Sequence, residues 1–251
     1  ASASVFGQTG PLRELPAYDM VVQGMGGLMS VTGQPNSEPT RVGTSIGDIT
    51  AGLFTAIGIN AALYDRQKTG KGMYIDVSML DCQIAILENA IARYLAKNEI
   101  PKPMGSRHPS IAPFEAFKTK DSYIIIAAGN DKLFEKLCNV LSLNELPKDK
   151  KYKSNLLRAE NMDDLKLLIE EKLKSLNTKD WIKKMENDKI PCGPIFNIKD
   201  AVENPQVKSR NMIVNTFHKV VGDFKTAGNP IKMSSYEDPS NRGDIPDLDE
   251  H

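Results

Sequence analysis

A long apolar segment behind a Gly-Asp pair constrains the fold of this chain more than any other feature. In residues 49–66 the large apolar side chains are separated mainly by Ala and Gly. The segment predicts a helix that is apolar on nearly all sides, and such a helix is expected to be buried in a domain core. Gly47 and Asp48 open this helix, and residues 68–72 are predicted to form the turn that ends it.

Composition is that of an ordinary globular protein. The 251 residues are 40% apolar and 25% charged, enough for one large or two modest domains. Lys plus Arg and Asp plus Glu both number 32, so no net field attracts nucleic acid or an anionic membrane. No unbroken apolar run of about 18 residues predicts a membrane span.

The cysteines and histidines are few and scattered. The three cysteines form no closely spaced pair, and the three histidines show no ligand spacing, so neither a disulfide framework nor a metal site is predicted. Unpaired cysteines fit a reducing compartment, and we expect a cytoplasmic protein, or a mitochondrial one if the source is eukaryotic.

The pattern of periodic segments predicts three parts. Residues 1–112 are expected to hold a strand at 1–6, a short Gly-rich helix at 18–30, the apolar helix, a strand at 74–77 and a helix from Ser78 to about Lys97. Residues 1–6 are typical of a strand already in progress and residues 244–251 form a polar tail, so we expect a fragment that is cut at both ends.

A loop rich in Pro, Gly and basic residues at 100–109 precedes the second part. Residues 113–213 predict a small α+β domain, with a hairpin at 114–118 and 123–128, helices at 131–141, 159–176 and 178–188, and a strand at 190–196. Residues 214–251 predict a hairpin at 217–224 and an extended tail that returns to the large domain.

Asp48 has two interpretations. As a helix cap it would stabilise the helix by about 1 kcal/mol, and the pattern alone favours this role. As a nucleophile it would be an aspartate held near helix-end amides, which favour its charged form by about 0.3–1 kcal/mol. Aspartate side chains are ordinarily ionised at neutral pH, so Asp48 would need no general base to attack a thioester.

The loop at residues 104–109 also has two interpretations. It combines flexible backbone with the guanidinium of Arg107 and the imidazole of His108. It is either an exposed linker or a lid over an anionic substrate. Residues 68–72 superficially resemble a phosphate-binding loop but lack its spacing, which favours the helix-ending turn.

Several short motifs, in their order along nearly the whole chain, resemble the class III CoA-transferase (CaiB/BaiF) family. They are Phe6-Gly-Gln-Thr-Gly-Pro11, Tyr18-Asp19, Gly26-Gly-Leu-Met-Ser-Val-Thr-Gly33, Gly47-Asp-Ile-Thr-Ala-Gly52, Lys68-Thr-Gly-Lys-Gly72, Asp76-Val-Ser78, Arg107-His-Pro-Ser-Ile-Ala-Pro113, Ala128-Gly-Asn-Asp131, Ile190-Pro-Cys-Gly-Pro194 and Asn204-Pro-Gln-Val207. The sequence as a whole is most similar to the branch of this family that uses dicarboxylate and hydroxy-dicarboxylate acyl groups.

The resemblance implies an α/β fold: the later part of a Rossmann-like large domain plus a small α+β domain, from an interlocked homodimer. A preceding half would supply most CoA contacts, so residues 1–251 alone are expected to be inactive. CoA is implied as substrate and product, with no tightly bound cofactor, and acyl-CoA and carboxylic acids are the implied partners. Neither nucleic acid nor membrane is expected.

The resemblance also implies roles for named residues. Asp48 would attack the acyl-CoA to give a mixed anhydride, which CoA thiolate converts to an aspartyl-CoA thioester. Tyr18, Asp19 and Gly47 would lie on the CoA side, where Asp19 steadies the reacting groups by hydrogen bonding. The loop Gly105, Ser106, Arg107 and His108 matches one that closes over the intermediate in formyl-CoA transferases, although the glycine run there is longer.

Two other functions stay open at this point. A 2-methylacyl-CoA racemase of the same fold pairs a histidine with an aspartate, but Tyr18 stands at the histidine position, and tyrosine is a poor proton shuttle near neutral pH. A non-catalytic fragment or interaction module belongs to a different class. CoA binding by this chain beside the full-length protein would separate it from an enzyme.

Overall fold

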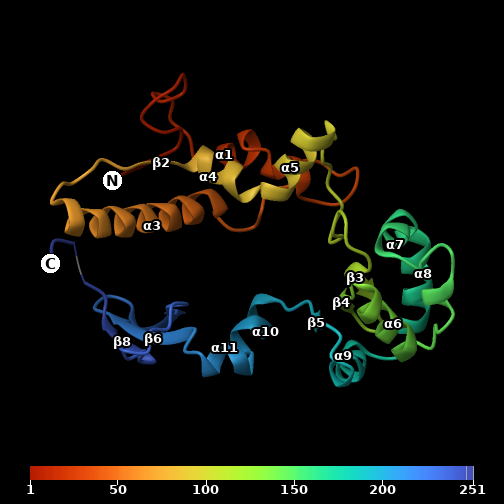
Figure 1. Cartoon of the computed structure of the whole chain (residues 1–251). Helices are drawn as coiled ribbons and strands as arrows, with labels where there is room; N and C mark the ends of the chain where they lie inside the picture. Colours follow the sequence, from red (N-terminus) through yellow and green to blue (C-terminus); the bar gives the residue numbers. More distant parts are fainter. Residues whose placement is uncertain (247, 251) are drawn as a thin grey trace. The chain divides into compact units, whose positions relative to one another are not determined.

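A computed structural model describes residues 1–246 and 248–250 of the chain (Figure 1). The chain divides into two compact units. The first consists of Ala1–Ala116 and Ile126–Ile169, and the second of Phe117–Ile125 and Glu170–His251. Helices and strands are mixed in both, as predicted, so the chain is of the α/β class in the broad sense. The three-part division at residues 112/113 and 213/214 stays a prediction.

The first unit opens with a parallel strand pair and a group of helices. Its elements are β1 (Ser2–Ser4), α1 (Asp19–Met25), α2 (Leu28–Val31), α3 (Ile46–Thr69), β2 (Asp76–Ser78), α4 (Met79–Ile86) and α5 (Glu88–Lys97). Strand β1 pairs with β2 in parallel, with Ser2 opposite Asp76. The α3 helix packs against α1 and α4 (Figure 1).

Local sequence explains where these helices start and stop. Ser78 caps α4, because its hydroxyl oxygen accepts a hydrogen bond of 3.2 Å from the Asp81 amide. Gly70 ends α3 in the left-handed conformation, with φ of 70°, as predicted for the turn at 68–72. The single helices predicted at 18–30 and from Ser78 to Lys97 are each interrupted, at Gly26–Gly27 and at Leu87.

A small apolar cluster joins α1, α3 and α4. It consists of Val22, Ala51, Met79 and Cys82, all buried. Close packing here depends on Gly26, since a Cβ atom at that position would lie 2.7 Å from the Cβ of Gln83 on α4. The glycine at position 26 therefore lets α1 and α4 approach closely.

The prediction that α3 is a buried helix is wrong for the chain described. Its buried residues are Gly47, Thr50 and Ala51, all in the first turns, whereas Leu53 is 59% and Ile57 is 63% exposed. The pattern correctly predicts the helix but not its surroundings, because burial depends on a packing surface that α1 and α4 provide only at one end. By length and composition alone α3 could also cross a membrane, although it contains no unbroken apolar run of about 18 residues.

The middle of the chain holds a hairpin and a set of amphipathic helices. The elements are β3 (Phe114–Lys118), β4 (Tyr123–Ala127), α6 (Asp131–Val140), the 3-10 helix η1 (Leu146–Lys148), α7 (Asn155–Glu160) and α8 (Met162–Leu173). The hairpin and α6 are confirmed. The helix predicted at 159–176 is instead two helices that meet at Asn161, whose side-chain amide donates to the Leu157 carbonyl at 2.9 Å.

A fully buried arginine stabilises this part of the first unit. Arg158 donates to the carbonyls of Ala112 and Tyr152 at 2.8 and 3.0 Å and to the Asp131 carboxylate at 2.8 Å. Its guanidinium also lies 4.5 Å from the Phe134 ring centroid. Each of the three guanidinium nitrogens thus donates to an acceptor, and the group also lies over a ring, which compensates the cost of burying its charge.

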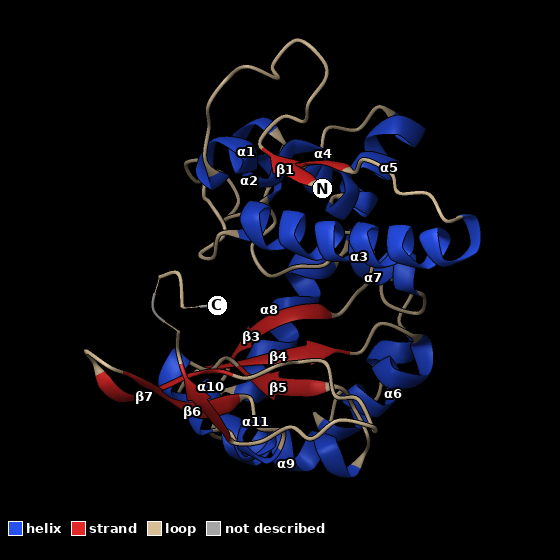
Figure 2. Cartoon of the chain, turned by 90° about the vertical axis from the view of Figure 1, so that its left-hand side faces the viewer, coloured by secondary structure: helices blue, strands red, loops and turns tan. Residues whose placement is uncertain are grey.

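The second unit contains short helices and strands that belong to two sheets (Figure 2). Its later elements are α9 (Thr178–Asn187), β5 (Cys192–Pro194), α10 (Ile198–Glu203), α11 (Pro205–Ser209), β6 (Ile213–His218), β7 (Gly222–Ala227) and β8 (Asn241–Asp244). The sheet orders are β3-β4-β5 and β7-β6-β8. The second predicted hairpin is confirmed as β6 and β7, with Gly222 at φ of 82°, whereas α10, α11 and β8 were not predicted.

Candidate active site

Asp48 lies in the first turn of α3, but it does not cap the helix. The helix begins at Ile46, and the capping position belongs to Ser45, whose side chain makes no capping bond. The Asp48 side chain is exposed. Within residues 1–246 and 248–250, its carboxylate has no hydrogen bond or ion pair. The interpretation of Asp48 as a structural cap is therefore wrong.

Asp19 of α1 provides the carboxylate that binds the start of α3. Its Oδ1 accepts a hydrogen bond of 2.7 Å from the Gly47 amide, and the residue is only 9% exposed. Its negative charge thereby lies at the positive end of the α3 dipole, where an anion is favoured. Asp19 performs the capping function from another helix.

Gln23, one turn further along α1, holds Asp19 and the preceding loop in place. Its Nε2 donates to Asp19 Oδ2 at 2.7 Å and to the Thr44 carbonyl at 3.3 Å, while its Oε1 accepts from the Val42 amide at 2.8 Å. Gln23 is fully buried. The side chains of Asp19 and Gln23 together fix the entry of the chain into α3.

Gly47 is required by this arrangement. A Cβ atom at position 47 would lie 2.9 Å from Asp19 Oδ1 and 3.3 Å from the Met79 Cε, so any side chain would push the carboxylate away. Tyr18 forms the N-terminal boundary of α1 beside Asp19, and its side chain is 86% exposed. The structure thus brings the predicted residues Tyr18, Asp19, Gly47 and Asp48 together where α1 and α3 begin.

The loop predicted to contact substrate is anchored at each residue. The Gly105 amide donates to the Gly33 carbonyl at 2.9 Å, and Ser106 Oγ accepts from the Ala116 amide at 3.0 Å. The His108 amide donates to the Phe114 carbonyl at 3.0 Å, and its ring stacks on that of Phe114 with centroids 5.4 Å apart. A closing movement would have to break these contacts, and it stays a prediction.

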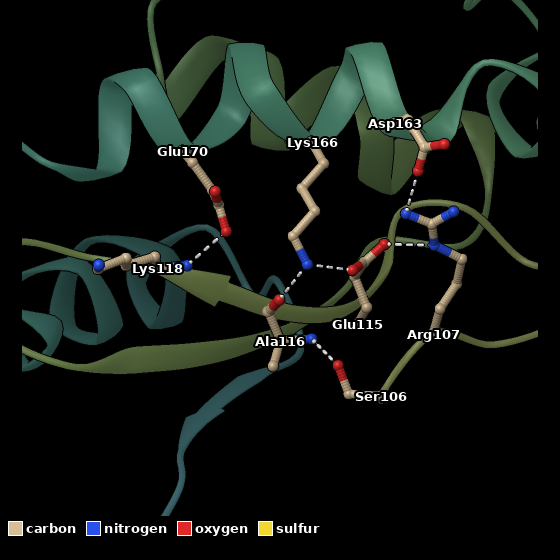
Figure 3. Close-up of polar contacts among 8 residues, drawn as sticks. All are labelled: Ser106, Arg107, Glu115, Ala116, Lys118, Asp163, Lys166 and Glu170. Carbon is tan, nitrogen blue, oxygen red and sulfur yellow. Dashed lines mark hydrogen bonds and ion pairs between the residues drawn. The ribbon is translucent and has the colours of Figure 1, made fainter. Parts of the chain in front are cut away.

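Arg107 is the centre of a charged cluster that links this loop to β3 and α8 (Figure 3). Its Nε donates to Glu115 Oε1 at 2.9 Å, and its Nη2 donates to Asp163 Oδ1 at 2.7 Å. Lys166 donates to the other oxygen of Glu115 and, at 2.9 Å, to the Ala116 carbonyl. Burial by itself would lower the pKa of Arg107, but the bonds to Asp163 and Glu115 raise it above its usual value.

The same loop lines two hollows of the first unit. One, of about 270 Å³, includes Arg93, Lys102 and His108 in its lining. The other, of about 390 Å³, is lined by the Arg107 cluster together with Gln34 and Ser106. Arg107 and Gly105 belong to both linings. The loop therefore presents cationic groups to space that a small anion could enter.

Comparison with known proteins identifies the family. The model of CoA-transferase family III matches residues 1–251. The chain belongs to CoA-transferase family III. The resemblance found in the short motifs is thereby confirmed.

Similar proteins are named as CoA-transferases of small dicarboxylates. The chain is 42% identical to an acetyl-CoA:oxalate CoA-transferase of Acetobacter aceti over all of its own length and 63% of the relative's. It is 37% identical to the human succinyl-CoA:glutarate CoA-transferase, with 94% of the chain and 54% of the relative covered. The chain therefore spans between about half and two thirds of the length of these relatives.

A solved structure of the family has the same fold. A CaiB/BaiF family protein from Brucella suis is 38% identical, with a TM-score of 0.79 over 94% of this chain and 61% of that one. The broad prediction of a mixed helix and sheet fold of the CaiB/BaiF type is confirmed. The Rossmann-like large domain and the interlocked dimer stay predictions.

Sequence reasoning missed the partners of the predicted residues. Gln23, Glu115, Asp163 and Lys166 were not singled out. One signal was available: Glu115 and Phe117 are two residues apart on the predicted strand and therefore share a face. Both prove buried, so an acidic residue occupies an inward position and needs a cationic partner. Among the residues that the structure describes, no group of three or more His, Cys, Asp or Glu could hold a metal ion.

Proposed function

We propose that the complete protein containing this chain transfers CoA from an acyl-CoA thioester to a carboxylic acid, with Asp48 as the nucleophile. The observation that carries the proposal is the exposed carboxylate of Asp48, which has no partner in the described part of the chain and lies in the first turn of a helix whose start is bound by Asp19. Because Asp19 already binds the amide of Gly47, Asp48 is not needed for capping. Membership of CoA-transferase family III supports the same reaction class.

The first half of the reaction loads the enzyme. A carboxylate oxygen of Asp48 attacks the thioester carbonyl, the carbon–sulfur bond breaks, and CoA leaves as a thiolate. The product is a mixed anhydride between the acyl group and Asp48. The thiolate then attacks the Asp48 carbonyl, the donor carboxylate leaves, and Asp48 carries CoA as a thioester.

The second half repeats these steps with the acceptor. The acceptor carboxylate attacks the aspartyl thioester and releases CoA thiolate, which gives a new mixed anhydride. The thiolate attacks the acyl carbonyl of that anhydride, the new acyl-CoA departs, and the Asp48 carboxylate is restored. No proton has to be moved at the reacting carbon, so an ionised aspartate meets the chemical requirement without a general base.

We assign Asp19 and Gln23 to positioning rather than to chemistry. Both oxygens of Asp19 already accept hydrogen bonds, from Gly47 and from Gln23. These bonds orient the first turn of α3, which carries Asp48. The role suggested by the resemblance, a direct hydrogen bond from Asp19 to the reacting groups, is not needed in this proposal. Tyr18 is exposed beside them and is proposed to contact CoA.

The proposed acyl groups are those of small dicarboxylic acids. Oxalate and glutarate occur in the names of the two relatives described above, and a relative from Haloarcula marismortui is a succinyl-CoA:mesaconate CoA-transferase that is 32% identical. The loop with Arg107 and His108 is proposed to contact such an acid, because the Arg107 guanidinium lines both hollows and His108 lines one of them.

The remaining part of the protein is proposed to cover α3. The apolar side chains of α3 are exposed along most of the helix. The strands β1 and β2 form a parallel pair of three residues each. Parallel sheets are ordinarily larger and covered on both faces. We propose that a preceding Rossmann-like half extends this sheet and packs on α3, that it binds most of the CoA, and that two complete copies form an interlocked homodimer.

Trapping the covalent intermediate tests the function directly. The complete protein is mixed with succinyl-CoA, stopped in acid and digested, and the peptide that contains Asp48 is analysed by mass spectrometry. We expect CoA on that peptide, or a hydroxamate at Asp48 after hydroxylamine. If the protein transfers CoA while Asp48 stays unmodified in both treatments, Asp48 is not the nucleophile. If no transfer occurs with any acid tested, the proposed function fails.

A further inference from the structure

The hollow of about 390 Å³ beside Arg107 has an unusual balance of charge. Its lining contains two cations, Arg107 and Lys166, and two carboxylates, Glu115 and Asp163 (Figure 3). The two carboxylates differ sharply in their surroundings. The side chain of Glu115 is 3% exposed, whereas that of Asp163 is 89% exposed. One acid is part of the interior and the other is at the surface.

Glu115 fixes the two cations in place. It accepts from Arg107 Nε at 2.9 Å and from Lys166 Nζ with its other oxygen. A buried carboxylate between two cations is compensated and hard to displace, since removing either partner would leave charge in a poorly solvated site. Lys166 lies three residues after Asp163 on α8, so both side chains stand on the same face of that helix.

Asp163 holds Arg107 only weakly. Among the residues described, its carboxylate bonds only to Arg107 Nη2, at 2.7 Å, and ion pairs of exposed acids are typically worth about 0–1 kcal/mol because water competes for the carboxylate. A guanidinium carries several N–H donors in a planar fork suited to carboxylate and phosphate. A second anion that enters the hollow could therefore replace Asp163 at little cost.

We propose that Arg107, supported by Lys166 and fixed by Glu115, is an anion-binding site, and that Asp163 is its internal, replaceable occupant. The anion is the terminal carboxylate of a dicarboxylic acid or a phosphate of CoA. Both groups present anionic oxygens that accept hydrogen bonds from a guanidinium. The inference rests on the proposed function for the identity of these two sources. The binding of an anion at Arg107 does not depend on it.

Charge at position 163 should control anion affinity. The test uses the complete protein and measures binding by calorimetry, with glutarate, acetate, CoA and 3′-dephospho-CoA as probes. The key variant is Asp163→Asn, which removes the competing charge but keeps the shape. The matched control is Asp164→Asn, since Asp164 is the neighbouring acid, is 59% exposed and pairs with Lys151 at 3.2 Å, outside the hollow.

If the proposal holds, Asp163→Asn binds one probe about twofold to fivefold more tightly than the control does, the range that corresponds to an exposed ion pair. Tighter glutarate with unchanged acetate identifies the terminal carboxylate as the source. Tighter CoA with unchanged 3′-dephospho-CoA identifies the 3′-phosphate, and a gain for both CoA forms identifies the diphosphate. Arg107→Gln should weaken the same probe by at least about tenfold, the effect of losing a charged hydrogen bond.

The proposal is overturned if Asp163→Asn and Asp164→Asn bind all four probes alike. Its failure is distinguishable from failure of the proposed function, because binding is measured without turnover. An anion site at Arg107 with no adduct on Asp48 would leave the site standing and remove the reaction. An Asp48 adduct with equal binding by both variants would support the reaction and rule out the anion site at Arg107.

Discussion

The start of α3 and the Arg107 cluster both lie in the first unit, and both contain an exposed and a buried carboxylate. At α3 the buried acid, Asp19, binds a backbone amide, and the exposed acid, Asp48, has no partner among the residues described. At Arg107 the buried acid, Glu115, binds two cations, and the exposed acid, Asp163, binds one. The difference separates a group free to react from a group that occupies a binding site.

In both regions the buried acid organises the exposed one. Asp19 sets the direction of the helix that carries Asp48, and Glu115 sets the position of the guanidinium that Asp163 contacts. Changes at the exposed acids should therefore affect chemistry or affinity with little effect on folding. Changes at the buried acids should affect folding as well.

Replacing Asp48 should have the largest effect on rate. Asp48→Asn keeps the shape of the side chain but removes the carboxylate that we propose as the nucleophile, so we expect CoA transfer to fall by at least about a thousandfold, which is about 4 kcal/mol of barrier. The melting temperature should be almost unchanged, because the carboxylate makes no contact in the described part of the chain. Steady-state rates and thermal melting of the complete protein check both. If the variant keeps more than about a tenth of the parent's rate, Asp48 is not the nucleophile.

Replacing Asp19 should lower both stability and rate. Asp19→Ala leaves the Gly47 amide and the Gln23 side chain without their buried partner, at a cost of about 1–3 kcal/mol for each unsatisfied group. We expect a clear fall in melting temperature and in kcat. Asp19→Asn retains an oxygen for Gly47 and should recover part of both. If Asp19→Asn is as inactive as Asp48→Asn yet fully stable, Asp19 acts on the reacting groups and is not a positioning residue.

The elements were predictable from the sequence because their signals are local. The Ser78 cap, the Gly70 stop and both hairpins depend on residues close together in the chain. The bonds that build the sites are not local: Asp19 and Gly47 are 28 residues apart, and Arg107 and Asp163 are 56 apart. A single sequence carries no signal for such pairs. The α3 pattern shows the same limit, since it predicted the helix but could not show what covers it.

Replacing Glu115 should destabilise the protein without removing the nucleophile. Glu115→Gln leaves Arg107 and Lys166 facing a neutral, buried partner, and we expect a loss of about 1–3 kcal/mol. The matched control is Glu99→Gln, whose side chain is 54% exposed and pairs with Arg93 at 2.9 Å. Thermal melting of the two variants should differ by several degrees. Equal melting temperatures would mean that burial of Glu115 contributes nothing to the stability of the cluster.

Replacing Asp163 should have the smallest effect on stability. Its carboxylate, like that of Asp164, lies at the surface, with side-chain exposures of 89% and 59%, and ion pairs of exposed acids contribute about 0–1 kcal/mol. Asp163→Asn and Asp164→Asn should therefore melt within about 2–4 °C of the parent, the shift that 1 kcal/mol gives in a protein of this size. Added salt should shrink both differences, because it screens surface charges. A larger, salt-resistant loss for Asp163→Asn alone would show that Asp163 is a fixed part of the cluster, and an anion could not then replace it cheaply.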